Sequence, residues 1–250
     1  MERKFLFIYF TLFMFSCTSA QKNIHSTVPL HEKWTALLQK NVSINGKVNY
    51  KAMKADKVKL YEYLAILSKQ KPGSNWSKNE KLAFWINAYN AFTVKLIIDN
   101  YPLKSIKDLN PTLSIIFVNT VWDKKIFSIG GKKMSLNNIE HSILRKMNEP
   151  RIHFTIVCAS VSCPNLLNTA YQADIVDKQL NQAAIHFLSD KSKNIIDKSK
   201  PQLSKIFDWF GGDFKVNGRS TIDFINQFTA IQIDKNADIG YLTYNWNLNE

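Results

Sequence analysis

Several features that mark other protein classes are missing from this chain of 250 residues. There is no internal repeat and no low-complexity tract, which argues against solenoid and disordered architectures. After residue 20, no segment is long and apolar enough for a transmembrane helix. The net charge is +13, but the lysines are spread along the chain, with no arginine-rich stripe and no recognised nucleic-acid motif. We therefore expect a globular protein that does not bind nucleic acid.

The first 20 residues have the order of a bacterial export signal. A basic start, Met1–Lys4, is followed by the apolar run Phe5–Phe15 and by small residues up to Ala20. The run is too short to span a bilayer as a helix. We expect an exported protein, either soluble in the periplasm or anchored in a bacterial envelope as a lipoprotein through Cys17. We prefer the lipoprotein because acylation explains a cysteine at this position. Residues 21–29 are then a polar tether.

Residues 30–250 are expected to form a single domain. Hydrophobic residues make up 45% of the chain and aromatic residues 12%, which is typical of a globular protein with a sizeable core. We expect a monomer that contacts the membrane only through an N-terminal lipid. For an exported protein, the positive charge favours an anionic lipid or polysaccharide as its counterpart.

A long buried helix is the most distinct element in the sequence. Ser77 and Glu80 have the spacing of a capping box. The following segment, Lys81–Ile98, is apolar nearly all round, which is typical of a helix enclosed on most sides. Tyr101-Pro102 ends it. We expect this segment to be the central helix of the domain.

The remaining segments mix helices and strands. Gly130-Gly131 suits the positive φ angles of a tight hairpin between two strands. The predicted class is α+β: the central helix packs on a small, mainly antiparallel sheet, flanked by further helices. Helices are expected at Leu30–Leu38, Lys57–Lys69, Ser135–Met147, Asp174–Ser189 and Thr221–Phe228, and strands at Val121–Ile129, Lys132–Ser135, Arg151–Cys158, Asn194–Asp197 and Gln202–Phe207.

Thiol and imidazole side chains gather in one stretch of the sequence. Cys163 lies in a turn after the predicted strand that carries His153 and Cys158, and His141 is a short helix upstream. A thiol beside an imidazole is the pairing of a nucleophile and its base. We predict Cys163 as the nucleophile and His141 as the base. The alternatives are a buried small side chain, or a disulfide between Cys158 and Cys163 in an oxidising compartment.

A metal site would need both thiols and both imidazoles to converge on a tetrahedron. The Cys-x4-Cys spacing is loose for this purpose, and strand alternation directs His153 away from Cys158. We therefore expect no metal and no cofactor. The same alternation favours a structural role for His153, with orientation of the base as the functional alternative.

Asn87 and Asn90 are amides within the otherwise apolar central helix. A buried amide without partners costs about 1–3 kcal/mol, so each needs a specific partner. A structural role that ties the helix to loop backbone is favoured. The catalytic alternative is that they orient a histidine or stabilise an oxyanion.

Separated motifs in register resemble the family called domain of unknown function 547, from about Leu60 to Phe214 and on to the C-terminal segment. The resemblance places Asn87, Asn90, His141, Arg145, His153, Cys158 and Cys163 on family positions, and it departs at Asn245, where the family pattern has Asp. It implies membership of a family that includes exported bacterial proteins, with no settled activity. The motifs are Phe84–Ala91, Ile139–Arg145, Arg151–Phe154 with Ser162–Pro164, and Leu203–Phe207 with Asp213-Phe214.

Two functions follow from these residues. The first is a thiol-dependent hydrolase or acyl transferase that acts on envelope peptides or amides, with Cys163, His141, His153, Asn87 and Asn90 in its catalytic site. The second is a non-catalytic envelope binding module whose Cys158 and Cys163 form a disulfide. A long helix on a small sheet with Cys and His nearby also looks distantly like the papain plan, except that papain-like enzymes place the thiol at the start of the helix.

Overall fold

The structure is a computed structural model that describes residues 30–111, 120–215 and 218–250. The predicted export signal and tether lie outside these residues. The described chain forms helices of varied length and two small two-stranded sheets, so the predicted α+β class is confirmed. In the described ranges, no helix combines the length and apolarity that crossing a bilayer requires.

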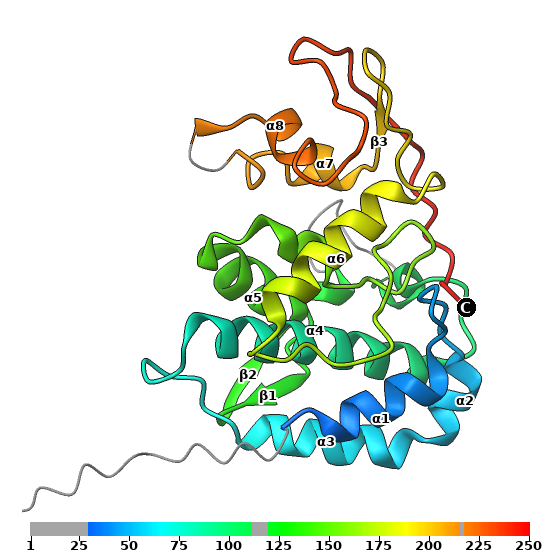
Figure 1. Cartoon of the computed structure of the whole chain (residues 1–250). Helices are drawn as coiled ribbons and strands as arrows, with labels where there is room; N and C mark the ends of the chain where they lie inside the picture. Colours follow the sequence, from blue (N-terminus) through cyan, green and yellow to red (C-terminus); the bar gives the residue numbers. More distant parts are fainter. Residues whose placement is uncertain (1–29, 112–119, 216–217) are drawn as a thin grey trace, which may run out of the picture.

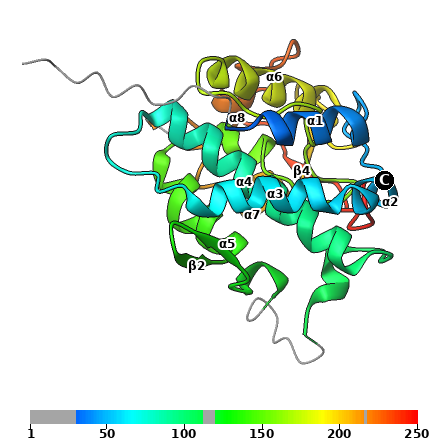
Figure 2. The same cartoon turned by 90° about the horizontal axis from the view of Figure 1, so that it is seen from below.

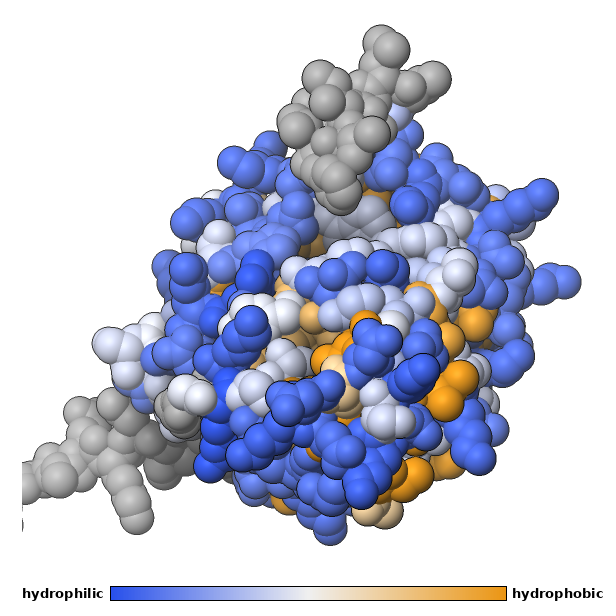
Figure 3. All heavy atoms as spheres, turned by 90° about the horizontal axis from the view of Figure 1, so that it is seen from above, coloured by the Kyte–Doolittle hydropathy of each residue, from blue (hydrophilic) through white to orange (hydrophobic). Residues whose placement is uncertain are grey.

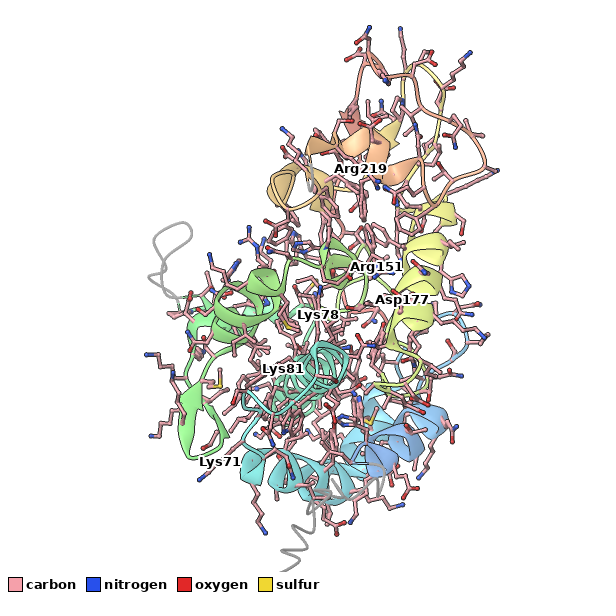
Figure 4. All side chains as sticks on the ribbon, turned by 60° about the vertical axis from the view of Figure 1, so that its left-hand side comes forward. Lys71, Lys78, Lys81, Arg151, Asp177 and Arg219 are labelled. Carbon is pink, nitrogen blue, oxygen red and sulfur yellow. The ribbon has the colours of Figure 1, made fainter. Side chains whose placement is uncertain are left out.

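Helix α4 (Lys78–Asn100) is the centre of the fold, as predicted. Ser77 and Glu80 form the reciprocal capping box at its start, and nearly every residue from Leu82 to Ile98 is buried. Helices α1 (Glu32–Asn41) and α3 (Lys57–Lys69) run beside it in both orthogonal views, and the short α2 (Tyr50–Ala55) joins them (Figures 1 and 2). In Figure 4, α4 is seen almost end-on, enclosed by the other elements.

The predicted hairpin is present but short. Strands β1 (Phe127–Ile129) and β2 (Lys132–Met134) pair antiparallel, with Phe127 opposite Met134. Gly130 and Gly131 make the turn with φ of +59° and +80°, values that glycine adopts without strain. The Phe127 ring stacks on Phe92 of α4 at a centroid distance of 4.1 Å. The first predicted strand begins too early, since Val121–Asp123 is a 3-10 turn, η2.

Residues 136–147 are helical, as predicted, but the helix changes type twice. It begins as α5 (Leu136–Ile139), widens into a π-helical turn, η3 (Glu140–Leu144), and tightens into the 3-10 turn η4 (Arg145–Met147). A π turn inserts an extra residue and redirects the side chains around it, and such turns are frequent at functional sites. Here the turn contains Glu140 and His141.

The strand predicted at Arg151–Cys158 is wrong. Residues Pro150–Phe154 form a 3-10 helix, η5, with Pro150 at its first position and the Glu149 side chain accepting a hydrogen bond from the Arg151 amide. Arg151 then binds Glu149 and, on α6 (Val176–Ser189), Asp177 at 2.8 Å and Asn181 at 2.7 Å (Figure 4). These contacts hold η5 against α6, and among the described residues no strand pairs with it.

A second hydrophobic cluster, at the top of the view in Figure 1, is connected by α6 to the cluster around α4. The N-terminal half of α6 packs in the cluster around α4, and its C-terminal half packs with Phe154 in the second cluster. That cluster takes in α7 (Ile206–Trp209) and α8 (Thr221–Ile225), the latter three residues shorter than predicted. Seen from this end, the described surface is mostly hydrophilic, with smaller hydrophobic groups between (Figure 3).

The two strands predicted near residue 200 are only partly present. Residues 194–197 contribute a single bridge, Ile195 to Gln202, and the second strand stops at Leu203. This strand, β3 (Gln202–Leu203), pairs in parallel with β4 (Gly240–Tyr241) near the C-terminus. The pairing brings the last ten residues of the chain beside the segment that carries both cysteines, where Val161 donates to the Asn247 carbonyl at 2.8 Å.

Candidate functional site

A cavity of about 810 Å³ lies between α4, the π turn, α7 and the C-terminal segment. All four of the predicted Cys and His side chains line it, together with residues from almost every part of the described chain. The lining comprises Tyr89, Lys107, Asn110, Thr120, Trp122, Asn137, Glu140, His141, His153, Ile156, Cys158, Cys163, Pro164, Ile206, Trp209, Phe210, Tyr244 and Trp246.

Both cysteines are free thiols, and their sulfur atoms are 2.9 Å apart, joined by a hydrogen bond. Cys158 is partly exposed, whereas Cys163 is only 4% exposed. The Cys158 amide donates to the Cys163 sulfur at 2.8 Å. Ala159, directly after Cys158, has a φ of +60°, a strained value for a residue with a side chain. Strained backbone persists only where the surrounding structure fixes it, and it is found most often at functional sites.

Hydroxyl groups surround the Cys158 sulfur. The Ser160 hydroxyl lies 3.1 Å from it and the Tyr244 hydroxyl 3.3 Å from it. Burial alone would raise the pKa of the Cys158 thiol, but the hydrogen bonds from Cys163, Ser160 and Tyr244 lower that pKa to about 7. At neutral pH a large fraction of Cys158 is therefore thiolate.

Cys163 is affected in the opposite direction. Burial raises the pKa of its thiol well above the ordinary value, and the hydrogen bond and negative charge of Cys158 raise it further. When Cys158 is ionised, the remaining thiol proton belongs to Cys163, so Cys163 must donate to the Cys158 sulfur. The geometry thus gives the anionic sulfur to Cys158 and the supporting thiol to Cys163, whereas the sequence prediction placed the nucleophile at Cys163.

The Asp213 carboxylate joins two other cavity side chains. It accepts two hydrogen bonds from the Arg145 guanidinium, at 2.5 and 2.8 Å, and one from His153 Nε2 at 2.8 Å. Burial opposes ionisation of Asp213, but the His153 and Arg145 hydrogen bonds outweigh it and hold the pKa of this carboxyl well below its usual range. Asp213 is therefore an anion that orients the His153 ring, which also stacks on Phe210.

The two histidines present different nitrogens to the cavity. Arg145 donates from Nη1 to His141 Nδ1 at 2.8 Å, and since a guanidinium cannot accept, the His141 lone pair is occupied. His153 bonds Asp213 through Nε2, which leaves its Nδ1 lone pair without a partner among the described residues. Burial lowers the pKa of both rings below the ordinary value of 6.5, so both are mostly neutral at pH 7. His153 is thus better placed than His141 to accept a proton.

Glu140 is a buried carboxyl group on the π turn. Tyr89 donates to its Oε2 at 3.1 Å. Burial raises the pKa of Glu140 to about 7, despite the Tyr89 hydrogen bond and the charge of Arg145, which lower it. About half of Glu140 is therefore protonated at neutral pH and able to donate a proton.

A family model covers most of the segments that carry these side chains. Residues 73–188 match the family described as "Protein of unknown function, DUF547". The predicted resemblance to this family is therefore confirmed over residues 73–188. No curated protein and no solved structure is significantly similar to the chain. The DUF547 match includes Glu140, both histidines and both cysteines, whereas Asp213, Tyr244 and Trp246 lie beyond its end.

Asn87 and Asn90 have structural partners in this DUF547 segment. The Asn87 side chain exchanges two hydrogen bonds with the Tyr171 backbone. Asn90 donates to the Thr155 carbonyl at 2.9 Å and accepts from the Val157 amide at 3.0 Å. Neither side chain lines the cavity, so their predicted catalytic role has no geometric support. Asn90 still matters to the site, because it holds the residues just before Cys158.

In the ranges that the structure covers, no three His, Cys, Asp or Glu side chains group as metal ligands do. Instead, the two thiols bind each other, and Asp213 and Arg145 connect the two imidazoles through hydrogen bonds. The residues that sequence reasoning missed are Asp213, Glu140 and Tyr244. Glu140 and Asp213 stand within or beside recognised motifs, which was the available signal, but neither motif shows that the side chain faces the thiols.

Proposed function

We propose that this protein is a thiol-dependent hydrolase or acyl transferase whose nucleophile is Cys158. The supporting observation is the Cys158 sulfur itself: it lies in a cavity, within hydrogen-bond distance of Cys163, Ser160 and Tyr244, and these contacts lower its pKa to about 7. A thiolate, and not a thiol, is the nucleophile, and here it forms without an imidazolium partner.

The reaction would proceed in two steps on an amide or ester. In the first, the Cys158 thiolate attacks the carbonyl carbon, and the leaving amine or alcohol takes a proton from the Glu140 carboxyl group. In the second, His153 Nδ1 removes a proton from water, which attacks the thioester and releases Cys158 as thiolate. Asp213 stabilises the imidazolium that forms, because its carboxylate is bound to His153 Nε2. The imidazolium then releases its proton to solvent, and the Glu140 carboxylate takes one up from solvent, which restores both groups. In a transferase, an acceptor amine or alcohol replaces the water.

An acyl-enzyme experiment tests this proposal. The protein is incubated with p-nitrophenyl acetate and examined by peptide mass spectrometry. We expect a burst of p-nitrophenol and an acetyl group on Cys158. Cys158→Ala should abolish both, Cys163→Ser should retain them, and His153→Gln should accumulate the acetylated form because deacylation slows. An acetyl group on Cys163, or a burst unchanged in Cys158→Ala, would refute the assignment.

A second candidate is a binding module in which the two cysteines are oxidised to a disulfide. The observation in its favour is the 2.9 Å separation of the sulfurs, which closes to a bond with little movement. Protein purified without reductant should then gain two hydrogens on reduction, and Cys158 should not react with iodoacetamide before it. An unchanged mass together with rapid alkylation would exclude this module and leave the thiol enzyme.

We also propose that the protein acts as a monomer in a bacterial envelope, on envelope peptides or amides. The order of residues 1–20 supports export, and the net charge of +13 suits an anionic polymer or lipid surface. Cell fractionation and the mass of the mature N-terminus test this: a soluble product begins at Gln21, whereas a lipoprotein begins at acylated Cys17. Full-length protein in the cytoplasm would contradict export.

A further inference from the structure

Part of the cavity wall consists of aromatic rings, of which only Tyr244 takes part in the reaction above. This aromatic wall consists of Trp122, Trp209, Tyr244 and Trp246. Trp246 contacts the other three, with ring centroids 5.9 Å away for Trp122, 5.8 Å for Trp209 and 4.6 Å for Tyr244. Trp209 is 47% exposed. Exposed, preformed aromatic surface within a cavity is characteristic of sites that bind a planar or apolar group.

A lysine stands over this wall. The Lys107 ammonium group lies 4.4 Å from the centre of the Trp246 ring and lines the same cavity. Within the described ranges, no carboxylate pairs with it. The acidic residues before and after it in sequence are already engaged: Asp99 binds Lys95 and Tyr61, Asp108 caps η1 (Ile106–Leu109), and Asp123 binds Thr120 and Asn137. A cation left unpaired at a cavity wall favours an anionic ligand.

Two amide side chains complete the lining of this part of the cavity. The Asn110 Oδ1 accepts a hydrogen bond from the Val121 amide at 2.9 Å, and its NH2 group has no hydrogen-bond partner among the described residues. Asn137 donates its NH2 group to Asp123 at 2.6 Å, which leaves its Oδ1 as a free acceptor in the same part of the structure. One donor and one acceptor are what a peptide group requires.

From these contacts we infer that this part of the cavity binds an N-acylated aromatic residue with a free carboxylate. The ring lies on the aromatic wall, the carboxylate faces Lys107, and the peptide group lies between Asn110 and Asn137. Tyr244 belongs to this wall and also reaches the Cys158 sulfur, so the ligand is held beside the nucleophile. The inference rests on the proposed function only in making this ligand part of the substrate.

Calorimetry with three ligands and the Cys158→Ser full-length chain tests the inference, since this variant cannot turn a ligand over through the thiol. The ligands are N-acetyl-L-phenylalanine, its neutral amide and N-acetyl-L-alanine. We expect the first to bind about tenfold more tightly than either of the others, because only it has both the ring and the charge. Lys107→Met should remove the preference for acid over amide, and Trp246→Ala should weaken binding of both aromatic ligands.

Lys104→Met is the matched control, because Lys104 is an exposed lysine of the same segment outside the cavity. It should bind all three ligands as the Cys158→Ser parent does. Equal affinity for acid and amide in that parent, or equal losses in the two lysine variants, would overturn the inference. Its failure is separable from that of the proposed function: acetylation of Cys158 without ligand binding removes only the substrate class, whereas binding without acetylation removes only the chemistry.

Discussion

The sulfur atoms of Cys163 and Cys158 are 2.9 Å apart, and the Cys158 backbone amide donates to the Cys163 sulfur. One thiol is therefore partly exposed and acidic, while the other is buried and retains its proton. This division of roles follows from position alone, since both residues have the same side chain. Substitution of Cys163 can therefore test its effect on the reactivity of Cys158.

Replacement of Cys163 should change the reactivity of Cys158 without removing it. Cys163→Ala deletes a hydrogen-bond donor to the Cys158 thiolate, so the pKa of Cys158 should rise towards the ordinary thiol value of about 8.5. Cys163→Ser keeps a donor and should retain most of the lowered pKa. The measurement is the rate of iodoacetamide alkylation of Cys158 against pH. Identical profiles for the alanine and serine variants would show that Cys163 does not support the thiolate.

The two buried amides of α4 offer a matched pair. Asn87→Leu and Asn90→Leu each leave two backbone groups unsatisfied, so each should lower the free energy of unfolding by about 2–4 kcal/mol in urea titrations. Of the two, only Asn90 binds Val157, the residue before Cys158. Only Asn90→Leu should therefore alter the pH profile of Cys158 alkylation. A similar change in Asn87→Leu would mean that general loosening, and not local positioning, is responsible.

The central helix could be predicted from sequence because its evidence is local. Ser77 and Glu80 are three residues apart, and an apolar run enclosed on all sides has few other solutions. The error at residues 151–158 has the same origin. Alternating apolar residues satisfy a strand, but Pro150 also suits the first position of a helix, and the choice depended on whether a partner strand existed.

The candidate site was predicted only as a set of residue types. Cys158, Cys163, His141 and His153 do line one cavity, because titratable side chains close in sequence tend to stay close in space. Their surroundings also depend on Asp213 and Tyr244, which approach from distant segments of the chain. Contacts such as Cys158 with Tyr244, 86 residues apart, have no local signature. Consequently the different surroundings of the two thiols, and of the two imidazoles, could not be predicted from the sequence.

Glu140 should make the protein less stable as the pH rises from about 4.5 to about 7. Its pKa is about 7 in the folded chain and near 4.5 when unfolded, so the folded state holds the proton more tightly and loses that advantage on ionisation. The loss is roughly 2–3 kcal/mol. Glu140→Gln should flatten urea stability over this range. Tyr89→Phe should extend the decline to higher pH, because the Tyr89 hydrogen bond lowers the pKa of Glu140. A wild-type curve as flat as that of the glutamine variant would contradict the burial argument.

Asp213→Asn should disconnect His153 from its anion while keeping the shape of the side chain. In the wild type, Asp213 raises the pKa of His153 against the larger, opposing effect of burial. Without the charge, that pKa should fall further below 6.5, which NMR titration of the ring protons measures. The free energy of unfolding should drop by about 1–3 kcal/mol, because Arg145 and His153 lose a charged acceptor. Asp208→Asn is the control, since Asp208 is exposed and its one ion-pair partner among the described residues is Lys205, and its effect should stay below about 1 kcal/mol. An unchanged His153 titration in Asp213→Asn would mean that the carboxylate positions Arg145 alone, and the second step of the proposed reaction would lose its base.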